Sequence, residues 1–148
     1  MKIYIGTDHN GFNLKVGLAD YLRRSGYEVV DEGDLKLNPD DDFPKFASLV
    51  VSNLLRDQDP ESRGILVCGS GQGMCMAANR FKGIRASIIW DANEARLARN
   101  DDDSNVLCLP ASVLKSEKAN QIVHTWLTTP FAAAPRYIRR IQEMDKLG

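Results

Sequence analysis

Short runs of apolar residues alternate along the chain with longer stretches in which apolar residues recur every three or four positions. The short runs are typical of β-strands, and the longer periodic stretches are typical of amphipathic helices. The third run is wholly apolar, which indicates a strand buried on both faces, as in a parallel sheet. We predict five strands, over Lys2–Thr7, Tyr27–Val30, Ile65–Cys68, Ile84–Ile89 and Asn105–Leu109, the last one interrupted by Pro110.

Helical spacing fills the intervals between the predicted strands. After the first strand, apolar residues recur at this spacing from Phe12 to Leu22, and Gly26 marks the expected end. The other helices are expected from Met74 onwards and over Phe43–Leu55, Ala92–Asn100, Glu117–Leu127 and Ala134–Leu147. Four residues of the second helix are expected to face the core: Phe46, Leu49, Val50 and Leu54.

Strands that alternate with helices through the whole length indicate βαβ units and a parallel sheet. We therefore expect one α/β domain over residues 1–148, a Rossmann-like, doubly wound three-layer sandwich with five parallel strands and a C-terminal helix that extends from the core. Ligands of such folds bind outside the carboxyl ends of the strands. This edge should carry the turns Asp8-His9, Cys68–Gly73, Trp90-Asp91 and Pro110.

The composition is ordinary for a globular protein, with 43% hydrophobic and 26% charged residues in a chain of 148. The formal net charge of −1 gives no general attraction to nucleic acid or to a membrane surface, so any anion site must be local. No apolar run approaches the ~20 residues that a membrane-spanning helix needs. The chain opens directly on a predicted strand, without the hydrophobic segment of a signal peptide.

The three cysteines, Cys68, Cys75 and Cys108, are scattered and odd in number. Such a set argues against a disulfide framework and for a reducing compartment, so we expect a cytoplasmic protein. The sequence has no CxxC and no nearby pair of histidines, so it also lacks the ligand spacing of a zinc site. We expect no metal.

The segment Cys68–Gly73 combines a strand end, a glycine-rich turn and the start of a helix. This arrangement directs several backbone N–H groups at one anion. A thiol at such a helix N-terminus tends to have a lowered pKa, so Cys68 is a candidate base or nucleophile. A tight turn with a structurally buried cysteine is the alternative interpretation.

Several familiar motifs are absent from this segment. The glycines fall as GxGxG, so the dinucleotide pattern GxGxxG is missing, and no Gly-Lys-Ser/Thr follows as in a Walker loop. A phosphatase loop of the form Cys-x5-Arg would need arginine where Met74 stands, and a phospho-acceptor receiver domain would need aspartate at Cys68. The remaining hypothesis for this segment is a cysteine beside an anion-binding loop that uses neither a metal nor a nucleotide.

Three further features are candidates for chemistry. Asp8 is a good helix N-cap, but its neighbour His9 follows a strand at the same edge and is suited to acid–base work or to hydrogen bonding a substrate. Arg136 and Arg140 are four residues apart, so they share one helix face and form either a phosphate clamp or a solvated basic face. His124 lies within a predicted helix, and we expect it to be structural or solvent-facing rather than catalytic.

Five motifs in order resemble the type B ribose-5-phosphate isomerase / galactose-6-phosphate isomerase family: Gly6-Thr7-Asp8-His9-x-Gly11-Phe12, Cys68-Gly69-Ser70-Gly71-x-Gly73-Met74 with Ala77-Ala78-Asn79, Gly83-Ile84-Arg85-Ala86, Asn105-Val106-Leu107 and Arg136-x3-Arg140. The resemblance covers essentially the whole chain. It implies a cofactor-free aldose–ketose isomerase of sugar phosphates in carbohydrate metabolism, with a pentose 5-phosphate of the pentose phosphate pathway as the leading substrate. It also implies a homodimer or homotetramer whose subunits share active sites.

The resemblance further implies a role for each matching residue. Cys68 would be the base that moves a proton between C1 and C2, and Ser70 would assist proton movement between the two oxygens. The backbone N–H groups of Gly69, Ser70, Gly71, Gln72 and Gly73 would stabilise the cis-enediolate. Asp8 and His9 would bind the sugar, and Arg136 and Arg140 would hold the phosphate.

The sequence departs from the family pattern at three places. The family usually has His-Asn, whose histidine assists ring opening, where this chain has Asp101 and Asp102. A family arginine that binds phosphate aligns with Ser112, and a frequent histidine aligns with Trp90. If Asp101 and Asp102 take the substrate-binding places of the family pair, they bring negative charge toward the phosphate. Ring opening is then done by His9, left to solution, or unnecessary because the substrate is acyclic.

Two other classes of function compete with the isomerase. A catalytically silent sugar-phosphate-binding protein, or the partner subunit of a hetero-oligomeric isomerase, would fit the replaced histidine and arginine, although the presence of Cys68 argues against it. A nucleotide-binding module of flavodoxin-like architecture is the third hypothesis, and saturable binding of ATP or FMN would favour it.

Overall fold

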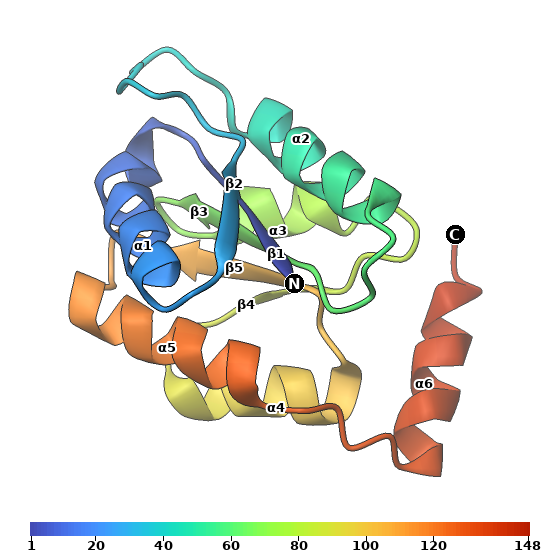
Figure 1. Cartoon of the computed structure of the whole chain (residues 1–148). Helices are drawn as coiled ribbons and strands as arrows, with labels where there is room; N and C mark the ends of the chain where they lie inside the picture. Colours follow the sequence, from blue (N-terminus) through green and yellow to red (C-terminus); the bar gives the residue numbers. More distant parts are fainter.

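The computed structural model describes residues 1–148 and contains a five-stranded parallel sheet in the order β2-β1-β3-β5-β4 (Figure 1). This confirms the predicted parallel sheet, with β3 at its centre. The strands are β1 (Lys2–Thr7), β2 (Glu28–Asp31), β3 (Arg63–Cys68), β4 (Ala86–Ile88) and β5 (Val106–Pro110).

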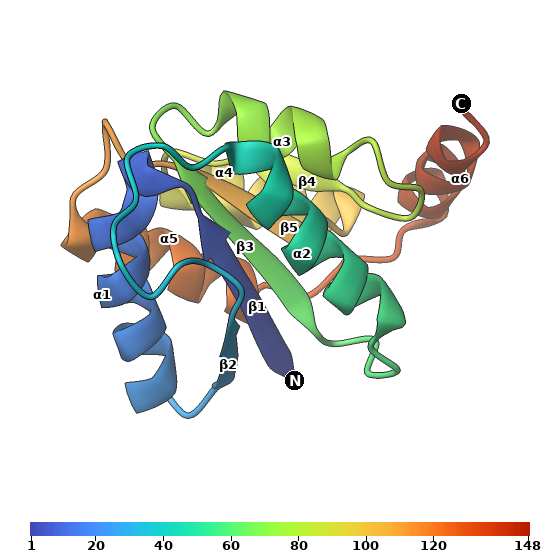
Figure 2. The same cartoon turned by 90° about the horizontal axis from the view of Figure 1, so that it is seen from above.

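Helices cover both faces of the sheet and make the predicted three-layer sandwich (Figure 2). Helices α1, α4 and α5 pack on one face, and α2 and α3 pack on the other. The helices are α1 (Phe12–Arg24), α2 (Phe43–Arg56), α3 (Gln72–Ala78), α4 (Ala92–Asp102), α5 (Ser116–Thr128) and α6 (Pro135–Asp145), with a short 3-10 turn, His9–Gly11, before α1.

The two-residue period of β3 divides its side chains between the two hydrophobic layers. Ile65 and Val67 belong to the cluster under α1, α4 and α5, whereas Leu66 and Cys68 belong to the cluster under α2 and α3. All six residues of β3 are buried. The side chain of Cys68 therefore emerges on the α2–α3 face, at the carboxyl end of the central strand.

Two local predictions are wrong. Pro110 does not interrupt β5 but is its last residue, opposite Cys68, where the absence of a proline N–H is tolerated because the ladder ends there. Leu49 is 38% exposed, since the buried stripe of α2 runs through Ala47, Val50, Val51 and Leu54. Val51, rather than Leu49, completes that stripe.

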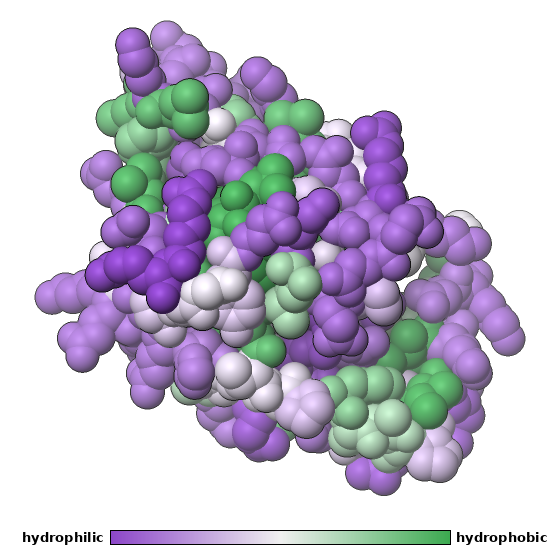
Figure 3. All heavy atoms as spheres, viewed as in Figure 1, coloured by the Kyte–Doolittle hydropathy of each residue, from purple (hydrophilic) through white to green (hydrophobic).

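The C-terminal helix α6 extends from the core, as expected, and none of its residues is buried (Figure 1). The segment before it touches the rest of the fold through the Ala132 N–H, which donates to the Asn100 carbonyl at 3.1 Å. In Figure 3 most of the visible face is hydrophilic, but apolar residues gather beside the start of α6. None of the six α-helices combines the length and apolar character that spanning a bilayer requires.

Candidate active site

The ends of β1 and β3 form the centre of the predicted ligand edge. Thr7 pairs with Val67 in the register of these strands, so the turns that follow them begin side by side. The Thr7 hydroxyl donates to the carbonyl of Val67 at 2.8 Å and fastens the two strand ends together. The topology thus brings Asp8-His9 next to Cys68, as the sequence predicts.

The loop after β3 directs one backbone N–H, that of Gly71, at the Cys68 sulfur. Cys68 is 5% exposed, and the Gly71 N–H donates to its Sγ at 3.1 Å. Gly71 has a φ of +76°, a left-handed conformation that favours glycine. This hydrogen bond fixes the Cys68 sulfur against the glycine-rich loop, at the carboxyl end of the central strand.

Ser70 and Ser112 fix the remainder of this loop. The hydroxyl of Ser70 accepts a hydrogen bond from the Gln72 N–H at 3.3 Å, and both residues are exposed. The backbone N–H and the hydroxyl of Ser112 donate to the Gly69 carbonyl at 2.9 and 2.6 Å. Ser112, noted in the sequence only as the replacement of a family arginine, therefore anchors the turn that follows Cys68.

Two neighbours lie directly against the glycines of the loop. A Cβ added at Gly69 would lie 3.5 Å from Cβ of Asn10, and a Cβ added at Gly73 would lie only 2.7 Å from Cζ of Phe43. A side chain at position 73 would therefore have to displace the aromatic ring. The sequence pattern places Phe43 only at the start of a helix. Nothing in that pattern indicates that Phe43 borders the glycine-rich loop.

His9 is held by a carboxylate that sequence analysis missed. Oδ1 of Asp41 accepts from the His9 backbone N–H at 2.9 Å and pairs with Nδ1 at 2.8 Å. Because a carboxylate only accepts, Nδ1 carries the proton and Nε2 is left for a ligand. The hydrogen bond that the His9 ring donates to Asp41 is the main cause that raises the pKa of His9 above its usual value. The run Asp40-Asp41-Asp42 was the available signal, but composition could not single out its middle member.

Asp8 has the capping role that was one of its two interpretations. Its Oδ1 accepts from the Asn10 N–H at 3.0 Å at the start of the 3-10 turn. The residue is 6% exposed, and no side chain or backbone group donates to its second oxygen. Asp8 can therefore cap the turn and still accept a hydrogen bond from a ligand.

Arg136 and Arg140 are not brought to Cys68 within one chain. They lie on α6, which stands on the side of the molecule away from the carboxyl ends of β1 and β3 (Figure 2). Both arginines are exposed, and Arg136 stacks on the Tyr137 ring with 4.4 Å to its centroid. A single chain therefore presents the thiol and the arginines as two separate half-sites.

Asp101 and Asp102 belong to the half-site of α6. Oδ1 of Asp101 accepts from the Asn100 side chain at 2.7 Å. Asp102 lines a cavity of about 690 Å³ together with Met144 from the end of α6. Burial and the Asp101 carboxylate raise the pKa of Asp102, whereas Arg140 opposes this shift. The acidic pair is thus close to one of the proposed phosphate ligands.

Cys75 and Cys108 lie behind the loop. Cys75 donates from Sγ to the Ala86 carbonyl at 3.3 Å, and its hydrogen bond with Cys108 lowers the pKa of Cys75. The same contact, with complete burial, raises the pKa of Cys108. No three His, Cys, Asp or Glu side chains are grouped closely enough to hold a metal ion.

Known proteins resemble this chain in sequence and in fold. A model of the ribose/galactose isomerase family matches residues 3–144. A probable ribose-5-phosphate isomerase B from Mycoplasma pneumoniae is 40% identical over 139 residues, which cover 94% of this chain and 90% of that protein.

Solved structures extend the likeness to the fold. A ribose 5-phosphate isomerase from Thermotoga maritima superimposes with a TM-score of 0.93 at 41% identity and covers 99% of this chain and 98% of its own. Ribose-5-phosphate isomerase B from Mycoplasma genitalium, solved with bound ribulose-5-phosphate, gives a TM-score of 0.93 at 36% identity, with 98% and 94% of the two chains covered.

Proposed function

This chain belongs to the ribose/galactose isomerase family, and we propose that it interconverts ribose 5-phosphate and ribulose 5-phosphate without a cofactor. The observation that carries the proposal is the thiol of Cys68, which ends the central strand and accepts an N–H from a loop of backbone donors. The three free cysteines are consistent with action in a reducing compartment, the cytoplasm.

The proposed reaction is a proton transfer through a cis-enediolate. The Cys68 thiolate removes the proton from C2 of the open-chain aldose, the electron pair of that C–H bond forms the C1–C2 double bond, and negative charge develops on O1. Backbone N–H groups of the loop stabilise that charge. Ser70 passes a proton from O2 to O1, and the thiol returns its proton to C1, which yields the ketose.

We infer that the phosphate is held by a second copy of the chain. Arg136 and Arg140 are four residues apart on an exposed helix, suited to a dianion, but lie away from Cys68 of their own chain. The same helix leaves apolar side chains uncovered, with Ile138 at 39% and Met144 at 43% exposure. A homodimer in which α6 reaches the partner's loop would cover these side chains and complete two sites.

Ring opening falls to His9 in this proposal. The family histidine is replaced by Asp101, whereas His9 is oriented by Asp41 and has Nε2 free at the edge next to Cys68. An imidazole can donate a proton to the ring oxygen and accept the proton of the anomeric hydroxyl. The alternative is that the natural substrate is acyclic and His9 opens no ring. In that case His9→Asn will slow the isomerisation of erythrose 4-phosphate and of ribose 5-phosphate by the same factor.

The proposal is tested by isomerisation in D₂O with sugar phosphates of four to six carbons. We expect deuterium to enter C1 or C2 of ribulose and ribose 5-phosphate, and Cys68→Ala to reduce the rate by at least ~10³-fold. Cys75→Ala is the matched control and should retain the exchange. Binding of these sugar phosphates without exchange would instead identify a silent partner subunit, the alternative that the replaced family histidine and arginine favour.

A further inference from the structure

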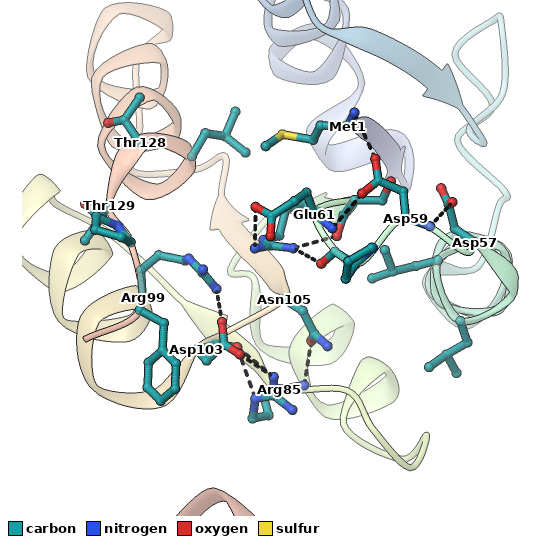
Figure 4. A pocket seen from close by; sticks show the side chains of 18 residues that line it. Met1, Asp57, Asp59, Glu61, Arg85, Arg99, Asp103, Asn105, Thr128 and Thr129 are labelled. Carbon is teal, nitrogen blue, oxygen red and sulfur yellow. Dashed lines mark hydrogen bonds and ion pairs between the residues drawn. The ribbon is translucent and has the colours of Figure 1, made fainter. Parts of the chain in front are cut away.

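A second cavity lies at the amino ends of the strands, opposite the proposed active site (Figure 4). It has a volume of about 670 Å³, which is in the range of small-molecule sites. Three arginines line it: Arg63 at the start of β3, Arg85 before β4 and Arg99 on α4. We call it the arginine cavity.

Two of the three guanidinium groups share one carboxylate. Arg99 Nη1 pairs with Asp103 Oδ1 at 2.8 Å, and Arg85 Nη2 pairs with Asp103 Oδ2 at 3.2 Å. Figure 4 shows the two arginines on either side of this aspartate. The side chains are well buried, with 6% of Arg99 and 17% of Arg85 exposed. The carboxylate of Asp103 therefore pairs with two buried cations at once.

The third guanidinium group has only one distant and exposed carboxylate partner. Arg63 donates from Nη1 to the carbonyls of Pro60 and Ser62, each at 2.9 Å. Its nearest acid is Glu61, 3.9 Å from Nη2, on a side chain that is 67% exposed. Burial, and next the charge of Arg99, lower the pKa of Arg63. Arg63 is thus a buried cation in the field of two others.

Donors remain free on these side chains. The hydrogen bonds of Arg99 use Nη1, and those of Arg85 use Nε and Nη2. The only fully enclosed side-chain nitrogen or oxygen without a partner is Oδ1 of Asn120, so the unused guanidinium nitrogens of these cavity-lining arginines are not sealed inside the protein. Planar groups with several free N–H donors suit a tetrahedral oxyanion.

The other charged groups of the cavity are already paired. Asp57 accepts from the Tyr4 hydroxyl at 2.9 Å, and Asp59 pairs with the N-terminal ammonium of Met1 at 2.9 Å. Glu61 reaches Arg63 only at 3.9 Å, so it is the acid that an anion would have to displace from Arg63. Leu54 and Phe131 add apolar wall to the same cavity.

We propose that the arginine cavity is a second anion site, which binds the phosphoryl group of inorganic phosphate or of a phosphorylated small molecule. Arg63 and Arg99 supply the free donors, and Glu61 competes with the ligand. The site is separate from the Cys68 half of the isomerase centre, because it lies at the opposite ends of β3 and β5 from Cys68 and the loop that follows it.

The test is a calorimetric titration with inorganic phosphate, carried out in the Arg136→Ala/Arg140→Ala background to remove binding at the proposed active site. In that background Arg63→Met should weaken phosphate binding at least ~10-fold, since it removes a charged donor. Glu61→Gln should tighten binding several-fold, and because Glu61 is exposed this variant keeps the fold intact.

Ribose 5-phosphate titrated in the same background separates the two sources of the phosphoryl group. Binding equal to that of phosphate assigns the site to the free anion, and tighter binding assigns it to a phosphorylated molecule. The proposal is overturned if phosphate does not bind at tens of millimolar, or if Glu61→Gln leaves the affinity unchanged. Isomerase activity is not the readout, so failure here does not touch the proposed function.

Discussion

At the scale of single residues, the Asp41–His9 pair decides the chemistry of the imidazole. One carboxylate oxygen binds both the backbone N–H and Nδ1 of His9, so the ring is fixed in orientation as well as in tautomer. Asp41 has a side chain only 8% exposed, whereas that of His9 is 31% exposed. A buried carboxylate behind an accessible imidazole leaves Nε2 facing outward as the reactive nitrogen.

Asp41→Asn is expected to lower the pKa of His9, because Asp41 is the main cause that raises it. The raised pKa stabilises the fold at low pH, fully below the ordinary value near 6.5, and this contribution is lost as pH rises through the folded-state pKa. The variant should therefore lose stability at pH 5 and little at pH 9. NMR titration of the His9 ring measures the shift, with His124 as the internal control, and an unmoved His9 titration would contradict it.

Gly73 is the residue at which the loop has no room for a side chain. Gly73→Ala places Cβ 2.7 Å from the Phe43 ring, so we expect a loss of ~1–3 kcal/mol in the free energy of unfolding and a lower kcat. Gly17→Ala is the matched control, because its nearest neighbour would be 3.9 Å away. Chemical denaturation measures both variants. If Phe43→Leu does not relieve the defect of Gly73→Ala, the clash with the ring is not its cause.

At the scale of elements, α6 differs from every other helix. The remaining five each contribute buried residues, whereas α6 contributes none. Its apolar side chains still recur at helical spacing, from Tyr137 and Ile138 through Ile141 to Met144. This uncovered amphipathic stripe is the surface that the proposed homodimer would bury.

Ile138→Glu is expected to leave the fold of the chain intact, since the side chain is 39% exposed, but to weaken the homodimer. On dilution, the specific activity should fall more steeply than that of the wild type, because dissociation of the dimer removes the phosphate half-site. Size-exclusion chromatography with light scattering measures the mass, and Glu143→Gln on the same helix is the control. A dimer of unchanged stability would show that α6 does not form the interface.

At the scale of the whole molecule, the two half-sites predict complementation between inactive variants. Cys68→Ala and Arg140→Ala each remove one half of every site in a homodimer. After the two are mixed and allowed to exchange subunits, half of the dimers are mixed, and each mixed dimer has one intact site, so activity should recover to about one quarter of the wild type. A mixture that stays inactive after verified exchange would place thiol and arginine in the same chain.

The sequence by itself determined the parallel sheet and the edge that carries the thiol. Alternating strand and helix patterns required a parallel sheet, and a parallel sheet gathers the residues that follow its strands at one edge, so Asp8, His9 and Cys68 could be grouped before any coordinates. The glycines at 69, 71 and 73 indicated the loop. Gly71 has a left-handed φ that favours glycine, and Gly73 lies against the ring of Phe43.

Only the tertiary structure decided which distant side chains meet. Asp41 was one of several acidic residues in a loop, and its contact with His9 depends on how that loop folds back over the end of β1. Two other arrangements also depend on long-range packing. Arg140 lies away from Cys68, and Arg63 and Arg99 line one cavity at the other end of the sheet. Local patterns encode the period and the ends of each element, whereas these contacts depend on how whole elements pack, which no window of sequence contains.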